Sequence, residues 1–168
     1  PRKILNGDIE GAREACEWYH RVFGDDYYLE LQRHEVTDPS VLANREAFPM
    51  QQRANKVLIE MSKEYGIKLV CTNDCHFEDK ETAEAHDHLL CLATGKDLDD
   101  PNRMRYSKQE WFKTREEMNA IFSDVPEALS NTLEVLDKVE VYSIDHGPIM
   151  PFFPIPESFG TEEQLRER

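Results

Sequence analysis

The chain places an acid and an imidazole two residues apart, directly after a short apolar segment. Residues 68–72 are typical of a β-strand, and Asp74 and His76 follow at its C-terminal end. Side chains alternate along an extended chain, so both should point to the same side. Carboxylate oxygen and imidazole nitrogen suit a divalent metal ion. The spacing predicts part of a metal site, and a solvated loop is the simpler alternative.

Three other groups are candidates for a role in or beside a metal site. His86 and Glu30 are candidates for hydrogen-bonding partners of the metal ligands. A hydrogen-bonded core histidine is the simpler interpretation of His86. Cys71 and Cys75 with His76 leave a structural zinc cluster open. It is the less favoured reading, because Cys75 and His76 should face opposite sides of the strand.

Helical and strand patterns alternate along the first half of the chain. We expect, in chain order, a helix from Asp8 to Gly24, a strand at 27–32, a polar irregular segment at 35–47, a helix at 50–65, a strand at 68–72 and a helix at 80–93. This order predicts an α/β fold with parallel strands joined by crossover helices. In such folds active groups gather at the C-terminal ends of strands, where Asp74 and His76 lie.

The apolar positions of two helices predict which faces turn toward the core. For the 80–93 helix the predicted inward residues are Ala83, His86, Leu89, Leu90 and Ala93. A second helix should begin at Asp124 with Pro126 in its first turn, and its predicted inward residues are Leu129, Thr132, Leu133 and Leu136.

The C-terminal third predicts a helical segment followed by a change of domain. Thr114 and Glu117 form a capping box that should start a short helix. Residues 139–144 are compatible with a short strand. Four prolines within 147–156 favour an extended, stiff segment. We therefore expect one domain at 1–146, a proline-rich linker at 147–160 and the start of another domain at 161–168.

Composition limits the possible partners and compartment. A net charge of −14 over 168 residues disfavours tight binding of nucleic acid backbones. No long apolar run is present, so we expect no membrane partner. Four cysteines without a paired framework favour a reducing, cytoplasmic location. Both ends look cut, which predicts that the chain is a piece of a longer protein.

Several stretches in order along the chain resemble the bacterial replicative DNA polymerases of the DNA polymerase III alpha-subunit family. These stretches are residues 28–32, 72–77, 84–87, 95–103, 126–132 and 153–156. The resemblance implies the rear half of the family's N-terminal PHP (polymerase and histidinol phosphatase) domain. It also implies a partial irregular (β/α)7 barrel, followed by a helical segment and a proline-rich linker toward the polymerase palm.

The resemblance also implies a metal centre. The family's closing Asp-x-His ligand motif maps onto Asp74 and His76. The remaining ligands would lie upstream of Pro1, so this piece alone should hold metal poorly and be inactive. The implied PHP metal is zinc or manganese, whereas magnesium serves a polymerase site outside this chain.

The implied activities are DNA-directed DNA polymerisation by the parent protein and metal-dependent 3′–5′ exonuclease action by the PHP domain. Implied partners are DNA, deoxynucleoside triphosphates, other replisome subunits and a separate proofreading exonuclease subunit. Two alternatives stay open. One is a catalytically silent PHP scaffold that docks the proofreading subunit, and the other is a free-standing PHP phosphoesterase.

Overall fold

The structure is a computed structural model that describes residues 1–36 and 42–152. By their contacts the residues fall into two units, Pro1–Lys138 and Val139–Arg168. In the second unit residues 139–152 form neither helix nor strand, so the strand predicted at 139–144 is wrong. Residues 153–168 lie outside the described residues, and the predicted linker and following domain stay predictions.

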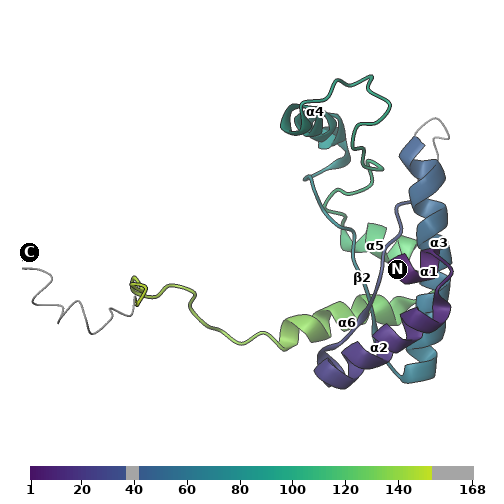
Figure 1. Cartoon of the computed structure of the whole chain (residues 1–168), viewed down its shortest axis with the longest axis vertical. Coiled ribbons are helices and arrows are strands. Elements are labelled where there is room, and N and C mark those ends of the chain that lie inside the picture. Colours follow the sequence, from purple (N-terminus) through teal and green to yellow (C-terminus); the bar gives the residue numbers. More distant parts are fainter. Residues whose placement is uncertain (37–41, 153–168) are drawn as a thin grey trace, which may run out of the picture. The chain divides into compact units, whose positions relative to one another are not determined.

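The first unit mixes helices with a small sheet (Figure 1). Its elements in chain order are α1 (Arg2–Leu5), α2 (Ile9–Phe23), a 3-10 turn (Gly24–Asp26), β1 (Leu29–Leu31), α3 (Leu42–Tyr65), β2 (Leu69–Cys71), a second 3-10 turn (Lys80–Thr82), α4 (Ala83–Thr94), α5 (Arg115–Ile121) and α6 (Pro126–Asp137). None of the helices that the structure describes has the length and hydropathy needed to cross a bilayer.

β1 and β2 form a two-stranded parallel sheet, as the order of elements predicted. Leu29 pairs with Leu69 and Leu31 with Cys71, so four buried side chains share the inner face. Glu30, between the two leucines, is exposed on the other face. The α/β class and the parallel strands are confirmed, and the larger PHP barrel remains a prediction.

α2 begins and ends where its capping residues predict. The Asp8 carboxylate accepts a hydrogen bond from the Gly11 backbone nitrogen at 2.9 Å. At the other end Gly24 adopts a positive φ of 55° and its N–H donates to the carbonyl of His20. Cys16 is buried on the inner side of the helix, as expected for a core residue.

α3 starts earlier than predicted. The helix was expected from residue 50, after a polar stretch that predicted an irregular segment at 35–47. The structure instead begins α3 at Leu42 and carries Pro49 in its interior. The prediction of an irregular segment is therefore wrong for residues 42–47, and residues 37–41 lie outside the described part of the chain.

The core lies between the sheet and helices α2, α3, α5 and α6. Its fully buried large side chains are Phe122, Leu31 and Met61. Further buried members are Ile4, Cys16, Leu29, Leu58, Ile67, Leu69, Cys71, Val125 and Ala128. Packing in this shared core holds the two strands in place, together with the start of the chain that leaves β2 toward Asp74.

Two predictions about the C-terminal helices have different outcomes. The Thr114–Glu117 capping box of α5 is present as predicted. The start predicted at Asp124 is wrong, because Val125 occupies the N-cap and the Asp124 carboxylate forms a bidentate pair with Arg33 at 2.6 and 2.9 Å.

The predicted inward face of α6 is largely wrong. Ala128 is the helix residue that is buried, while Leu129 is half-buried. Leu133 and Leu136 are 53% and 65% exposed, and Thr132 is also exposed. Apolar periodicity identified a stripe on this helix, but only its first turn packs on the core.

Candidate metal-binding site

Asp74 and His76 lie side by side at the end of β2. The strand ends at Cys71, and Asp74 then takes a positive φ of 47°, so the chain turns rather than continuing extended. The backbone nitrogen of His76 donates to the carbonyl of Glu110 at 2.7 Å. The Asp74 carboxylate lies 4.0 Å from His76 Nδ1. Proximity of the pair therefore comes from a turn and not from strand alternation.

In its neutral form the His76 ring takes the tautomer that its backbone contact selects. Nδ1 lies 2.6 Å from the backbone carbonyl oxygen of Asp74, which can only accept, so Nδ1 carries the proton. Nε2 is then an acceptor, and it receives the hydroxyl of Tyr106 at 3.0 Å. Metal-binding histidines commonly donate one ring nitrogen to a carbonyl and offer the other to the metal.

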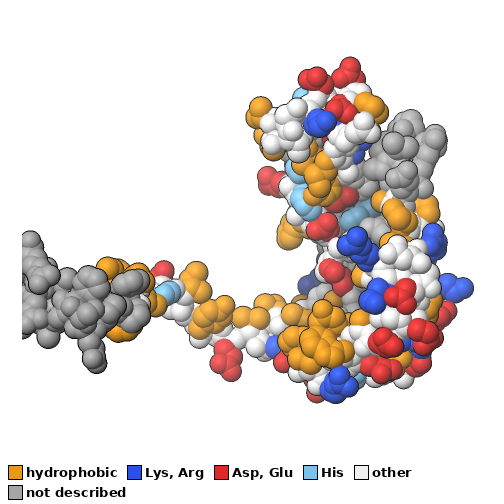
Figure 2. Space-filling model, viewed as in Figure 1, with side chains coloured by type: hydrophobic (Ala, Val, Ile, Leu, Met, Phe, Trp, Pro, Cys, Tyr) orange, Lys and Arg blue, Asp and Glu red, His pale blue; other side chains and the backbone are white. Residues whose placement is uncertain are grey.

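His86 and Tyr106 complete a small aromatic cluster around His76. The ring centroids of His76 and His86 are 5.8 Å apart, and those of His76 and Tyr106 are 4.4 Å apart. His86 also packs on Phe77 at 5.2 Å and is half-buried. Figure 2 shows histidine side chains at the surface beside α4. The structure thus places the predicted neighbour His86 in ring contact with His76.

Glu30 is placed differently. Its carboxylate accepts the hydroxyl of Thr72 at 2.6 Å, and Gln32 Nε2 donates to the same Thr72 oxygen at 3.3 Å. These residues occupy the outer face of the sheet. The structure therefore joins Glu30 to Thr72 rather than to Asp74 or His76.

A buried polar network that the sequence analysis did not assign holds the backbone on both sides of the turn. His34 is 5% exposed, and its Nε2 donates to the carbonyl of Asn73 at 3.1 Å while Nδ1 accepts from Gln51 at 2.9 Å. The Asn73 side chain donates to the carbonyls of Gln109 and Trp111 at 2.8 and 2.7 Å. The only signal for this network in the sequence is that His34 and Asn73 are polar residues that follow the two predicted strands.

Glu110, from the segment between α4 and α5, also joins this network. It is 3% exposed, and its carboxylate accepts the Ser107 hydroxyl at 2.6 Å and the Gln109 backbone nitrogen at 2.9 Å. One oxygen also lies 3.6 Å from His34 Nδ1. Hydrogen-bonding to several donors is what allows a carboxylate to be buried.

An ion pair anchors α4 to the loop that carries Tyr106. The two guanidinium nitrogens of Arg103 lie 2.6 and 2.7 Å from the carboxylate oxygens of Asp87. The side chains are 8% and 11% exposed. This hydrogen-bonded guanidinium holds the pKa of the Asp87 carboxyl below its ordinary value.

The same pair explains a wrong prediction about α4. Its buried residues are Ala83, Asp87 and Cys91, four residues apart, whereas Leu89 is 61% exposed. Asp87 was not among the predicted inward residues, because its buried partner Arg103 lies outside the helix and does not show in the helix pattern. The predicted inward face is correct only for Ala83 and, in part, for the half-buried His86 and Leu90.

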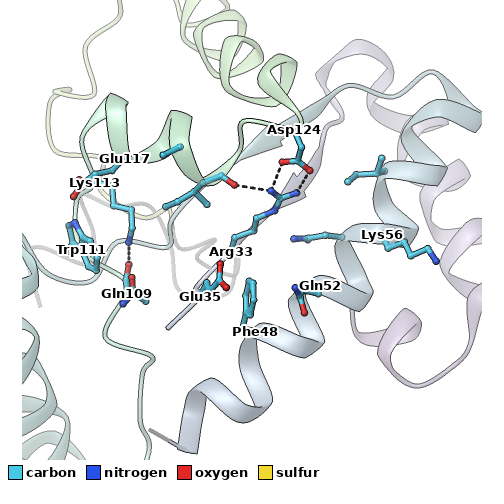
Figure 3. A pocket seen from close by; sticks show the side chains of 14 residues that line it. Arg33, Glu35, Phe48, Gln52, Lys56, Gln109, Trp111, Lys113, Glu117 and Asp124 are labelled. Carbon is cyan, nitrogen blue, oxygen red and sulfur yellow. Dashed lines mark hydrogen bonds and ion pairs between the residues drawn. The ribbon is translucent and has the colours of Figure 1, made fainter. Parts of the chain in front are cut away.

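A groove of about 910 Å³ lies next to this network (Figure 3). Arg33, held by Asp124, and Phe48 line one part of it, and Trp111 and Lys113 line another. The Lys113 amine lies 3.4 Å from the centroid of the Trp111 ring and donates to the carbonyl of Gln109. Burial lowers the pKa of Lys113 to about 8.

Curated relatives match almost all of this chain. DNA polymerase III subunit alpha of Borreliella burgdorferi is 37% identical over 163 residues, which are 96% of this chain and 13% of the relative. The subunit of Campylobacter jejuni is 37% identical, covering 93% of this chain and 12% of the relative. The chain belongs to the DNA polymerase III subunit alpha family. Its resemblance to that family is thereby confirmed.

The match covers nearly all of this chain but only a small part of each relative. DNA polymerase III subunit alpha of Mycobacterium tuberculosis is 33% identical over 98% of this chain and 13% of the relative. The chain therefore spans about 13% of the length of these DNA polymerase III alpha subunits. No protein-family model matches the chain.

The residues at hand fit one side of a metal site of this DNA polymerase III subunit alpha segment. Asp74 offers an exposed carboxylate, and Nδ1 of His76 lies at the Asp74 carbonyl, which leaves Nε2 as the ring nitrogen for a metal. Among residues 1–36 and 42–152 no group of three or more His, Cys, Asp or Glu side chains is placed to hold a metal ion. Cys71 is buried, which raises its thiol pKa to about 11, and Cys75 is exposed. Two protein ligands therefore fit, and further donors would have to come from elsewhere.

Proposed function

We propose that this chain is part of a replicative DNA-directed DNA polymerase. In that protein residues 1–146 would belong to a PHP domain that supports the polymerase and contributes Asp74 and His76 to a metal-dependent 3′–5′ exonuclease site. Membership of the DNA polymerase III subunit alpha family supports the first part. The observation that carries the second is the tautomer of His76, whose Nδ1 donates to Asp74 and whose Nε2 is an acceptor.

The residues of the chain divide the chemistry between them. Asp74 supplies an anionic oxygen ligand and His76 a neutral nitrogen ligand for zinc or manganese. A bound divalent ion supplies a water of lowered pKa and positive charge close to the phosphate oxygens. The His34–Asn73–Gln109 network holds the turn that carries both ligands.

The charge of the chain is consistent with a site of this kind. At −14 the chain as a whole repels the phosphate backbone of DNA. Positive charge from bound metal would reverse this repulsion locally and confine DNA contact to the site. Tight DNA binding by the rest of this chain is not part of the proposal.

The activities of the whole protein extend the proposal. Polymerisation would use magnesium at a site outside this chain, with DNA and deoxynucleoside triphosphates as substrates. Partners would be other replisome subunits, including a separate proofreading exonuclease subunit, in the cytoplasm. The relatives' name as a subunit supports assembly with further chains.

A silent scaffold is the second candidate. It is favoured by the finding that only two candidate ligands converge within the described part of the chain, and by the hydrogen-bonded network beneath them. A free-standing phosphoesterase has the least support, because the relatives are polymerase subunits of far greater length.

The test uses the full-length protein with Asp74→Asn and His76→Ala. We expect each variant to lose PHP-site metal and to lower the 3′–5′ exonuclease rate by about 100-fold or more, with polymerisation retained. His146→Ala is a matched control, because His146 is exposed and its Nδ1 likewise bonds the carbonyl two residues before it, at 2.9 Å.

Two other results would favour the scaffold. A wild-type protein without metal at this site would leave only the structural role. Metal loss that lowers thermal stability but leaves the exonuclease rate unchanged would make the ion a structural element.

A further inference from the structure

Nε2, the ring nitrogen of His76 that remains for a metal, already has a partner in this structure. Tyr106 donates its hydroxyl to Nε2 at 3.0 Å, while Nδ1 is committed to the carbonyl of Asp74. An imidazole nitrogen has one lone pair, so it cannot accept this hydrogen bond and bind a metal ion together. We propose that Tyr106 caps the metal-facing nitrogen of His76 and must release it before metal binds; this rests on the proposed metal site.

The contact is built into the cluster and is not a chance meeting of two surface side chains. The rings of Tyr106 and His76 pack with centroids 4.4 Å apart and planes inclined by 46°. The His86 ring meets Tyr106 edge-on at 5.2 Å. Tyr106 is half-buried and contacts both histidines, whose ring centroids are 5.8 Å apart.

The backbone on both sides of Tyr106 is also fixed. Arg103 is locked onto Asp87 of α4, and Arg105 donates to the carbonyl of Asp100 at 2.9 Å. On the other side Ser107 donates its N–H and hydroxyl to buried Glu110 at 3.1 and 2.6 Å. The hydroxyl is thereby delivered to His76 by a preorganised loop.

Exchange of a hydrogen bond for a metal bond has a predictable consequence. The metal-free state is stabilised by the Tyr106 hydrogen bond, so the metal must displace it and the apparent affinity falls. A purely structural Tyr106 would have the opposite effect, since its truncation would loosen His76 and weaken binding. The direction of the change in affinity therefore distinguishes a cap from a support.

The experiment measures zinc affinity of the full-length protein by competition with a chromophoric chelator. Zinc bound by His76→Ala protein is subtracted to isolate this site. Tyr106→Phe removes only the hydroxyl, and we expect it to bind zinc about threefold to tenfold more tightly than wild type. Tyr142→Phe is the control, because Tyr142 is 75% exposed, and it should leave the affinity unchanged.

The two ways of failing give different results. Zinc binding by the wild type with equal or weaker affinity in Tyr106→Phe would overturn the cap and leave the proposed metal site standing. Absence of His76-dependent zinc binding in both proteins would overturn the proposed metal site and the cap together.

Discussion

Arg103→Met is expected to lower the free energy of local opening of α4 by about 3 kcal/mol, because it leaves the Asp87 carboxylate without its partner. Both side chains are close to 10% exposed, at 8% and 11%, so water cannot replace the guanidinium well. The loss should make the amides of α4 exchange with solvent about 100-fold faster. Hydrogen exchange followed by mass spectrometry on the 168-residue chain measures it.

The effect should depend on pH in a defined direction. Arg103 lowers the folded-state pKa of Asp87 from its ordinary value of 3.8. A lowered carboxyl pKa stabilises the folded state above the unfolded value, and that stabilisation is lost as the pH falls through the folded value. The difference between wild type and Arg103→Met should therefore be full at neutral pH and shrink below about pH 4.

Lys96→Met provides a control within the same loop. Lys96 pairs with Asp100 at 3.1 Å, but the two side chains are 45% and 25% exposed. Such a pair contributes little, so α4 exchange should be nearly unchanged. Equal acceleration by Lys96→Met and Arg103→Met would show that burial of the Arg103 pair is not what anchors the helix.

Phe122→Ala is expected to destabilise the first unit by about 3–5 kcal/mol. Its ring is 1% exposed in the shared core, and the guanidinium of Arg33 lies 4.9 Å from the ring centroid. Truncation removes apolar contacts and leaves a cavity that the surrounding helices and sheet can only partly close. Urea unfolding followed by circular dichroism gives the change in free energy.

Phe112→Ala is the matched control for this substitution. Phe112 is the same residue type but is 77% exposed. Its truncation should change the free energy of unfolding by no more than about 0.5 kcal/mol. Similar midpoints for the two variants would mean that residues 115–128 do not belong to the cooperative core.

Local sequence signals predicted several helix boundaries correctly. They failed where a residue distant in sequence determines which contact a side chain makes. Asp8 and Gly24 bound α2 because caps act within one helical turn. Asp124 also has the sequence features of an N-cap. Its carboxylate instead pairs with Arg33, which follows β1, and the N-cap of α6 is the next residue, Val125. The start of α3 was misplaced because polar composition predicted an irregular segment at 35–47, whereas the helix begins at Leu42.

In the candidate site, too, residues close together in the sequence could be predicted, and residues brought together by folding could not. Asp74 and His76 could be selected because they are two residues apart and follow a strand. Tyr106, Glu110 and His34 lie 30 to 42 residues away from His76 along the chain. No periodicity connects such residues, and only the folded chain brings the Tyr106 hydroxyl to His76.

A crystal structure of the full-length protein soaked with manganese tests the central claim most directly, through the anomalous scattering of the metal. We predict a manganese peak within about 2.0–2.4 Å of His76 Nε2 and of an Asp74 carboxylate oxygen, with the Tyr106 hydroxyl displaced from Nε2. Manganese bound only elsewhere, with Tyr106 still hydrogen-bonded to His76, would contradict the assignment of Asp74 and His76 as metal ligands.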